Sequence, residues 1–132
     1  MIGLAVAAGA ALGATALGFQ TVAPTGQWYG KAICRGQRGS KQIALTFDDG
    51  PNDPHTLNLL DVLARHNVPA TFFLIGRYVR QRADIAAEIG KCGHIIGNHT
   101  FTHPLLTFQP ASEIRSEISQ CREAILEAAG DH

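Results

Sequence analysis

Two aspartates and two histidines are the residues of this sequence whose types and spacing fit metal chemistry. Asp48 and Asp49 are adjacent, and two such carboxylates repel each other unless a cation or a shared proton lies between them. His99 and His103 are four residues apart, a spacing that puts two imidazoles on one face of a helical turn. Two histidines and one aspartate leave the fourth position of a tetrahedral ion open, as in catalytic zinc sites. Taken singly, each pair also fits an ordinary protein surface.

Short apolar runs precede both motifs and predict strands. Ile43–Leu45 indicates a buried strand that ends at the aspartates, and Ile95–Asn98 indicates another that ends at His99. Between them, Thr71–Ile75 is apolar without alternation, as in a parallel strand that is covered on both faces. Because ligands of parallel α/β folds bind beyond the carboxyl ends of the strands, this placement favours one shared metal site.

Three helical regions are predicted between and after these strands. Asp53 is expected to cap the first, which Pro54 opens and which ends near residue 66. The second spans about residues 77–92, with a break near residues 83–84. The third is amphipathic. Its apolar stripe is Ile114, Ile118, Cys121 and Ile125, and its charged surface is Glu113, Arg115, Glu117, Arg122 and Glu127.

Three segments, in order along the chain, resemble the polysaccharide deacetylase family, which is carbohydrate esterase family four and carries the chitooligosaccharide deacetylase homology domain. They are residues 46–50 (TFDDG), 70–76 (ATFFLIG) and 93–103 (GHIIGNHTFTH). The resemblance runs from about residue 42 to about residue 126. It implies an α/β fold that consists of the first three β-α units of an irregular (β/α) barrel, with parallel strands and flanking helices.

The same resemblance implies a role for each site residue. Asp48 would be the catalytic base, whereas Asp49, His99 and His103 would bind a divalent metal, which is zinc or else cobalt or nickel. Thr100 would steady the loop between the two histidines. The implied function is metal-dependent hydrolysis that removes acetyl groups from N-acetylated or O-acetylated polysaccharide such as chitin, peptidoglycan or xylan.

The sequence departs from the family after His103. The family's later Arg-x-Pro-Tyr, Asp/Trp and Leu-x-His segments, the last of which carries the general acid, have no counterpart here, and His132 is the sole later histidine. We therefore expect the amino-terminal half of a deacetylase domain, through truncation or an incomplete reading frame. A non-catalytic metal- or carbohydrate-binding remnant is the alternative. A metal-dependent phosphoesterase is a third hypothesis, although the sequence has no glycine-rich phosphate loop.

The composition divides the chain into three parts. Residues 1–20 are apolar and predict an export signal or a membrane anchor through residues 2–19, and hence an exported or membrane-anchored protein of the cell envelope. A disordered tail or an incorrectly assigned start codon would instead leave a cytoplasmic protein. Residues 21–40 form a linker, and residues 41–132 form the partial deacetylase domain.

Charge, cysteines and sheet edges complete the expectations. The 132 residues carry 11 Lys+Arg and 11 Asp+Glu, so the net charge offers no basis for binding nucleic acid. Cys34, Cys92 and Cys121 are odd in number and favour three buried free thiols over a disulfide between two of them. A sheet of three strands leaves an open edge, which predicts self-association. His55 is expected to be an exposed histidine at a helix start, and a supporting role beside the two aspartates is the alternative.

Overall fold

The computed structural model describes residues 2–23, 25–28 and 30–130 of the chain. The chain separates into two units, residues 1–43 and residues 44–132. The first unit contains helix α1 (Ile2–Val22), and residues 30–43 that follow it have no helix or strand. In the part of the chain that is described, no helix has the length and apolar character needed to cross a membrane.

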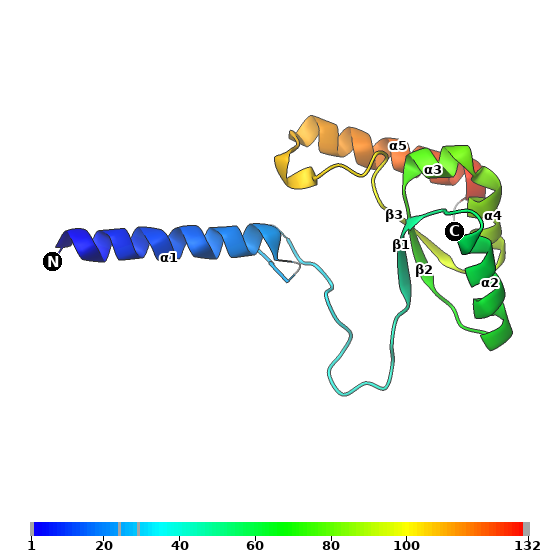
Figure 1. Ribbon diagram of the computed structural model, residues 1–132, viewed down its shortest axis with the longest axis horizontal. Coiled ribbons are helices and arrows are strands. Elements are labelled where there is room, and N and C mark those ends of the chain that lie inside the picture. Colours follow the sequence, from blue (N-terminus) through cyan, green and yellow to red (C-terminus); the bar gives the residue numbers. More distant parts are fainter. Residues whose placement is uncertain (1, 24, 29, 131–132) are drawn as a thin grey trace. The chain divides into compact units, whose positions relative to one another are not determined.

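The second unit is built on a parallel sheet of three strands in the order β1-β2-β3 (Figure 1). The strands are β1 (Thr46–Gly50), β2 (Thr71–Leu74) and β3 (Ile95–Asn98). Phe47 pairs with Phe72, which in turn pairs with Ile96. The predicted α/β fold with parallel strands and flanking helices is therefore confirmed.

The first strand begins later than the sequence predicted. Ile43 is 88% exposed, so the expected buried strand over residues 43–45 is wrong. Pairing with β2 begins only at Leu45, whose carbonyl accepts from the Thr71 amide at 3.0 Å. The strand is consequently formed by the TFDDG segment itself, which places both aspartates within its last three residues.

In the described part of the second unit, four helices lie between and after the strands. They are α2 (His55–His66), α3 (Gly76–Gln81), α4 (Ala83–Lys91) and α5 (Ala111–Ala129), with a short 3-10 turn, η1 (Leu106–Phe108), before α5. The interruption between α3 and α4 falls at Arg82, as the predicted break near residues 83–84 requires.

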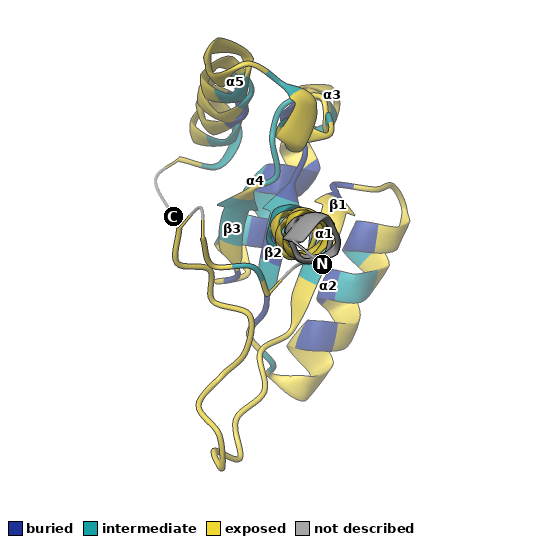
Figure 2. Cartoon of the chain, turned by 90° about the vertical axis from the view of Figure 1, so that its left-hand side faces the viewer, coloured by how far each residue is buried: buried dark blue, intermediate teal, exposed yellow. Residues whose placement is uncertain are grey.

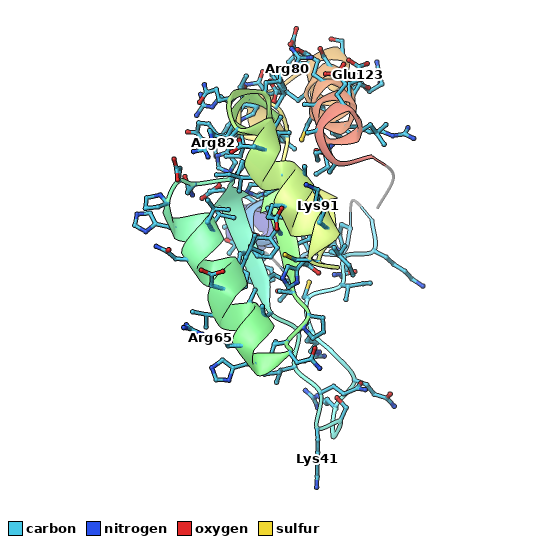
Figure 3. The ribbon with its side chains drawn as sticks, turned by 90° about the vertical axis from the view of Figure 1, so that its right-hand side faces the viewer. Lys41, Arg65, Arg80, Arg82, Lys91 and Glu123 are labelled. Atoms are coloured by element: carbon cyan, nitrogen blue, oxygen red, sulfur yellow. The ribbon has the colours of Figure 1, made fainter. Side chains whose placement is uncertain are left out.

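Asp53 does not cap α2. The helix begins after Pro54 without a side-chain cap, and the Asp53 carboxylate pairs instead with the guanidinium of Arg82. Arg82 lies at the junction of α3 and α4 (Figure 3). It also binds Asp84, with 2.8 Å between Nη2 and Oδ2. The segment that precedes α2 is therefore joined to the α3–α4 junction, because Arg82 pairs with Asp53 of the first and Asp84 of the second.

The core lies between one face of the sheet and the helices. Phe72 and Leu74 of β2 are buried, whereas Thr71 and Phe73, which alternate with them, are only half-buried. Figure 2 shows the buried positions concentrated where α2 and α4 meet the strands. The expectation that β2 is covered on both faces is thus wrong, because Thr71 and Phe73 on its other face stay partly exposed.

The cysteines differ in their surroundings. Cys121 of α5 is fully buried, and its thiol lies 3.3 Å from the Leu74 carbonyl oxygen. Cys92 is a free thiol at the exposed end of α4, and Cys34 is exposed in the first unit. The expectation of three buried thiols therefore holds for Cys121 alone, because the other two lie outside the helix–sheet interface.

Candidate metal centre

Three side chains converge at the carboxyl ends of β1 and β3. Asp49 Oδ1 lies 3.3 Å from His99 Nε2 and 3.5 Å from His103 Nε2. The two imidazole rings are 4.8 Å apart between centroids. In the described part of the chain these three residues form a group whose donor atoms all lie within 4.8 Å of one another.

Two of the three spacings between these donor atoms fit a zinc-sized ion. Bonds of about 2.0–2.2 Å in a tetrahedral site place two ligand atoms about 3.3–3.6 Å apart, which matches both measured distances from Asp49. The side chains of Asp49 and His103 are 62% and 50% exposed, whereas that of His99 is 28% exposed. Three donors with solvent on one side suit an ion that keeps an exchangeable position.

An irregularity in β1 falls at the two aspartates. The register with β2 shifts between Phe47 and Gly50, and Asp49 adopts a left-handed backbone conformation with φ of 65°. Asp49 thereby reaches the histidines. Asp48 instead lines a separate cavity of about 150 Å³ on the side of α2. The other residues that line this cavity are Phe47, Gly50, Asn52, His55, Thr56, Leu59 and Phe72.

The histidines converge through a loop and not through a helix. Residues 99–103 have no helical turn, which corrects the expected helical geometry. Thr100 and His103 adopt left-handed conformations with φ of 63° and 64°. The His103 amide donates to Thr100 Oγ1 at 3.1 Å, and the Thr100 amide donates to Asn98 Oδ1 at 2.9 Å. The two imidazole rings are therefore brought together by a tight turn with left-handed residues, and not by the one-turn spacing of a helix.

Backbone strain is concentrated at this cluster. Four described residues other than glycine have positive φ, and three of them are Asp49, Thr100 and His103. Such conformations cost about 1–3 kcal/mol each and persist only where the surroundings enforce them. The restraint comes from hydrogen bonds: the His99 amide donates to the Leu74 carbonyl, and the Gly76 amide donates to the Thr100 carbonyl, both at 3.0 Å.

Glu117 of α5 is a residue of this region that the sequence reasoning placed on the helix surface. Its Oε2 accepts hydrogen bonds from the amides of Phe101 (2.8 Å) and Thr102 (2.7 Å), and its Oε1 accepts from Thr102 Oγ1 (2.8 Å). Partial burial opposes its ionisation, but the bonds from Thr102 and Phe101 outweigh that effect and lower the pKa of Glu117. Glu117 is three residues after Ile114 and four before Cys121. This spacing places it on the same face of the helix as the apolar stripe, and it was the sequence signal that Glu117 faces the rest of the domain.

Asn98 is a second residue that the sequence reasoning did not single out. Besides accepting from Thr100, its side-chain amide donates to the Ile118 carbonyl of α5 at 2.8 Å. The end of β3, the histidine loop and α5 are thus joined by the side chains of Asn98 and Glu117. Both are exposed or half-buried polar residues, and neither has a local sequence pattern that reveals such partners.

Comparison with known proteins identifies similar chains. The family model described as "Polysaccharide deacetylase" matches residues 35–132. A chitooligosaccharide deacetylase of Rhizobium leguminosarum bv. trifolii is 48% identical over 88 residues, which are 67% of this chain and 41% of that protein. The solved Bc1960 peptidoglycan N-acetylglucosamine deacetylase is 42% identical with a TM-score of 0.70, over 72% of this chain and 44% of that one.

A third relative is BA3943 of Bacillus anthracis, described as a CE4 family pseudoenzyme. It is 31% identical with a TM-score of 0.70, over 74% of this chain and 34% of that one. The chain spans less than half the length of each of these three relatives.

Proposed function

Because the chain belongs to the polysaccharide deacetylase family, we propose that it carries the metal site of a hydrolase that removes acetyl groups from a polymer of N-acetylated sugars. The observation that carries this proposal is the convergence of Asp49, His99 and His103 beside a second aspartate. Relatives named for chitooligosaccharide and for peptidoglycan support an N-acetylglucosamine polymer as the substrate. An O-acetylated polysaccharide is the related alternative.

Asp49, His99 and His103 are proposed to hold one divalent cation, with zinc as the first choice and cobalt or nickel as alternatives. Such an ion supplies Lewis acidity, which polarises an acyl carbonyl and lowers the pKa of water. Asp49 contributes the single carboxylate of this ligand set, and the two imidazoles present Nε2 to its Oδ1. Thr100 keeps His103 in place through its hydroxyl.

Asp48 is proposed as the base that removes a proton from the attacking water. Asp48 directly precedes the metal ligand Asp49 in β1, and the role of base is the one that the family resemblance implies for it. His55, at the start of α2, lines the same cavity as Asp48. An amide substrate also needs an acid to protonate the leaving amine. After His103 the sequence contains no tyrosine and one histidine, His132, which lies outside the described residues.

We further propose an envelope protein with residues 1–20 as a signal or anchor, residues 21–40 as a linker and residues 41–132 as the deacetylase domain. The family match over residues 35–132 supports the position of the domain. Relatives named peptidoglycan-N-acetylglucosamine deacetylase, from Bacillus cereus and Listeria monocytogenes, support a substrate in the cell envelope.

The test measures acetate release by the zinc-loaded chain from chitooligosaccharides and from an aryl acetate. The aryl ester needs no protonation of its leaving group, so its hydrolysis reports the metal and the base without the acid. We expect aryl acetate hydrolysis that EDTA and Asp48→Asn both abolish, and much slower release from chitooligosaccharides. An aryl phosphate is the control for phosphoesterase activity. Phosphate release without acetate release would refute the proposal.

A non-catalytic metal-binding protein is the second candidate, because the similar BA3943 is described as a pseudoenzyme. The same experiment separates the two functions. Stoichiometric zinc binding without hydrolysis of either acetyl substrate would favour the second candidate, whereas metal-dependent ester hydrolysis would favour the first.

A further inference from the structure

We propose that Glu117 is a positioning residue of the metal site, which holds the loop that aims His99 and His103 at one point. The inference rests on the proposed function, since it assumes that these histidines bind a cation. It concerns a residue on α5, 14 positions beyond the second histidine. The hydrogen bonds of its carboxylate go to Phe101 and Thr102 of the loop, so Glu117 would act through the loop that carries the two histidines.

The contacts of the Glu117 carboxylate support this role. Both oxygens are used, and they accept three hydrogen bonds of 2.7–2.8 Å from Phe101 and Thr102. These two residues stand midway between the histidines in the sequence. Hydrogen bonds to an ionised acceptor are about twice as strong as neutral ones, so one carboxylate restrains the centre of the loop.

The opposite side of the loop is held by the first turn of α3. The Thr100 carbonyl accepts from the Gly76 amide, and the Phe101 carbonyl accepts from the Arg77 amide, each at 3.0 Å. The loop is therefore bound through its carbonyls to α3 and through its amides to Glu117. Such two-sided restraint is what the left-handed conformations of Thr100 and His103 require.

Helix α5 is itself packed against the sheet, so the backbone that carries Glu117 is held in position. Cys121, one turn later, is fully buried and its thiol contacts the Leu74 carbonyl oxygen. The Ile118 carbonyl accepts from the Asn98 side chain at the end of β3. The lowered pKa of Glu117 means that the carboxylate stays charged near neutral pH, which keeps all three bonds charge-assisted.

The test compares zinc affinity in Glu117→Gln and Glu117→Ala with that of the unmodified chain, by competition with a chromophoric chelator. Loss of residues that orient metal ligands lowers affinity about 10–100-fold, and we expect a loss in this range for both variants. The visible absorption of the cobalt-loaded protein should also change, because the two imidazoles shift. Glu113→Gln, an exposed glutamate one turn earlier on α5, is the matched control and should change neither quantity.

Thr102→Val is the second variant, and it guards against unfolding of the Glu117 variants. It removes only the bond to Oε1, and we expect a several-fold loss of zinc affinity with an unchanged circular dichroism spectrum. Unchanged affinity and cobalt spectrum in folded Glu117→Gln, or in Thr102→Val if the Glu117 variants unfold, would overturn the inference alone. Failure of the unmodified chain to bind zinc would overturn the proposed metal site and this inference with it.

Discussion

Replacement of Gly76 by alanine should destabilise the second unit. Gly76 begins α3 directly after β2, and α5 crosses it at very short range. A Cβ atom at this position would lie 2.8 Å from the Cα of Cys121 and 2.6 Å from Cδ2 of Phe101. The phenylalanine ring can rotate, but Cys121 Cα belongs to the backbone of a packed helix, so α5 itself must move.

The size of the effect follows from that contact. Cβ contacts below 3.4 Å are tighter than ordinary, so α5 must retreat by about 0.6 Å. Overpacking of this kind costs about 1–3 kcal/mol, and the better helix propensity of alanine recovers up to about 1 kcal/mol. We expect a net loss of about 1–2 kcal/mol in the free energy of unfolding.

Urea unfolding of the metal-free chain, followed by far-ultraviolet circular dichroism, measures this loss. With an m-value of about 1.5 kcal/mol per M, the midpoint should fall by about 1 M. Gly36→Ala is the control, because a Cβ atom added at Gly36 would meet no other part of the chain within 4 Å. An unchanged midpoint for Gly76→Ala would refute the argument that α5 is held at its closest approach here.

Three further predictions concern the metal and the sheet edge. In chelator competition, Asp49→Ala and His103→Ala should weaken zinc binding more than 100-fold. Asp48→Asn should leave the zinc affinity within about threefold of the unmodified chain, and loss of zinc in that variant would reverse the roles of the two aspartates. Free zinc at 100 times its Kd should raise the free energy of unfolding by about 2.7 kcal/mol, and EDTA should cancel the gain in a urea titration. An apolar groove of about 320 Å³ beside β3 includes Ile118, which is 46% exposed. If the chain self-associates through this face, Ile118→Lys should decrease the oligomer seen in sedimentation. An oligomer that persists in this variant would exclude the face.

The sequence by itself determined the order and kind of the elements. The apolar runs at Thr71 and Ile95 became strands, and the break between α3 and α4 fell where the pattern changed. These features are local, because strand and helix formation depends on which residues recur within a few positions. The resemblance of three collinear motifs likewise identified the family, since motif spacing is carried by the chain itself.

Only the tertiary structure decided the geometry of the site. The left-handed backbone of Asp49 coincides with a register shift between β1 and β2, and the histidines meet through a strained loop where helical spacing had been expected. The role of Glu117 depends on the packing of α5 against Leu74 and Gly76, more than 40 residues away in the sequence. Such contacts cannot be read from local periodicity, because a side chain's partner across the fold is set by packing between elements and not by its neighbours in the chain.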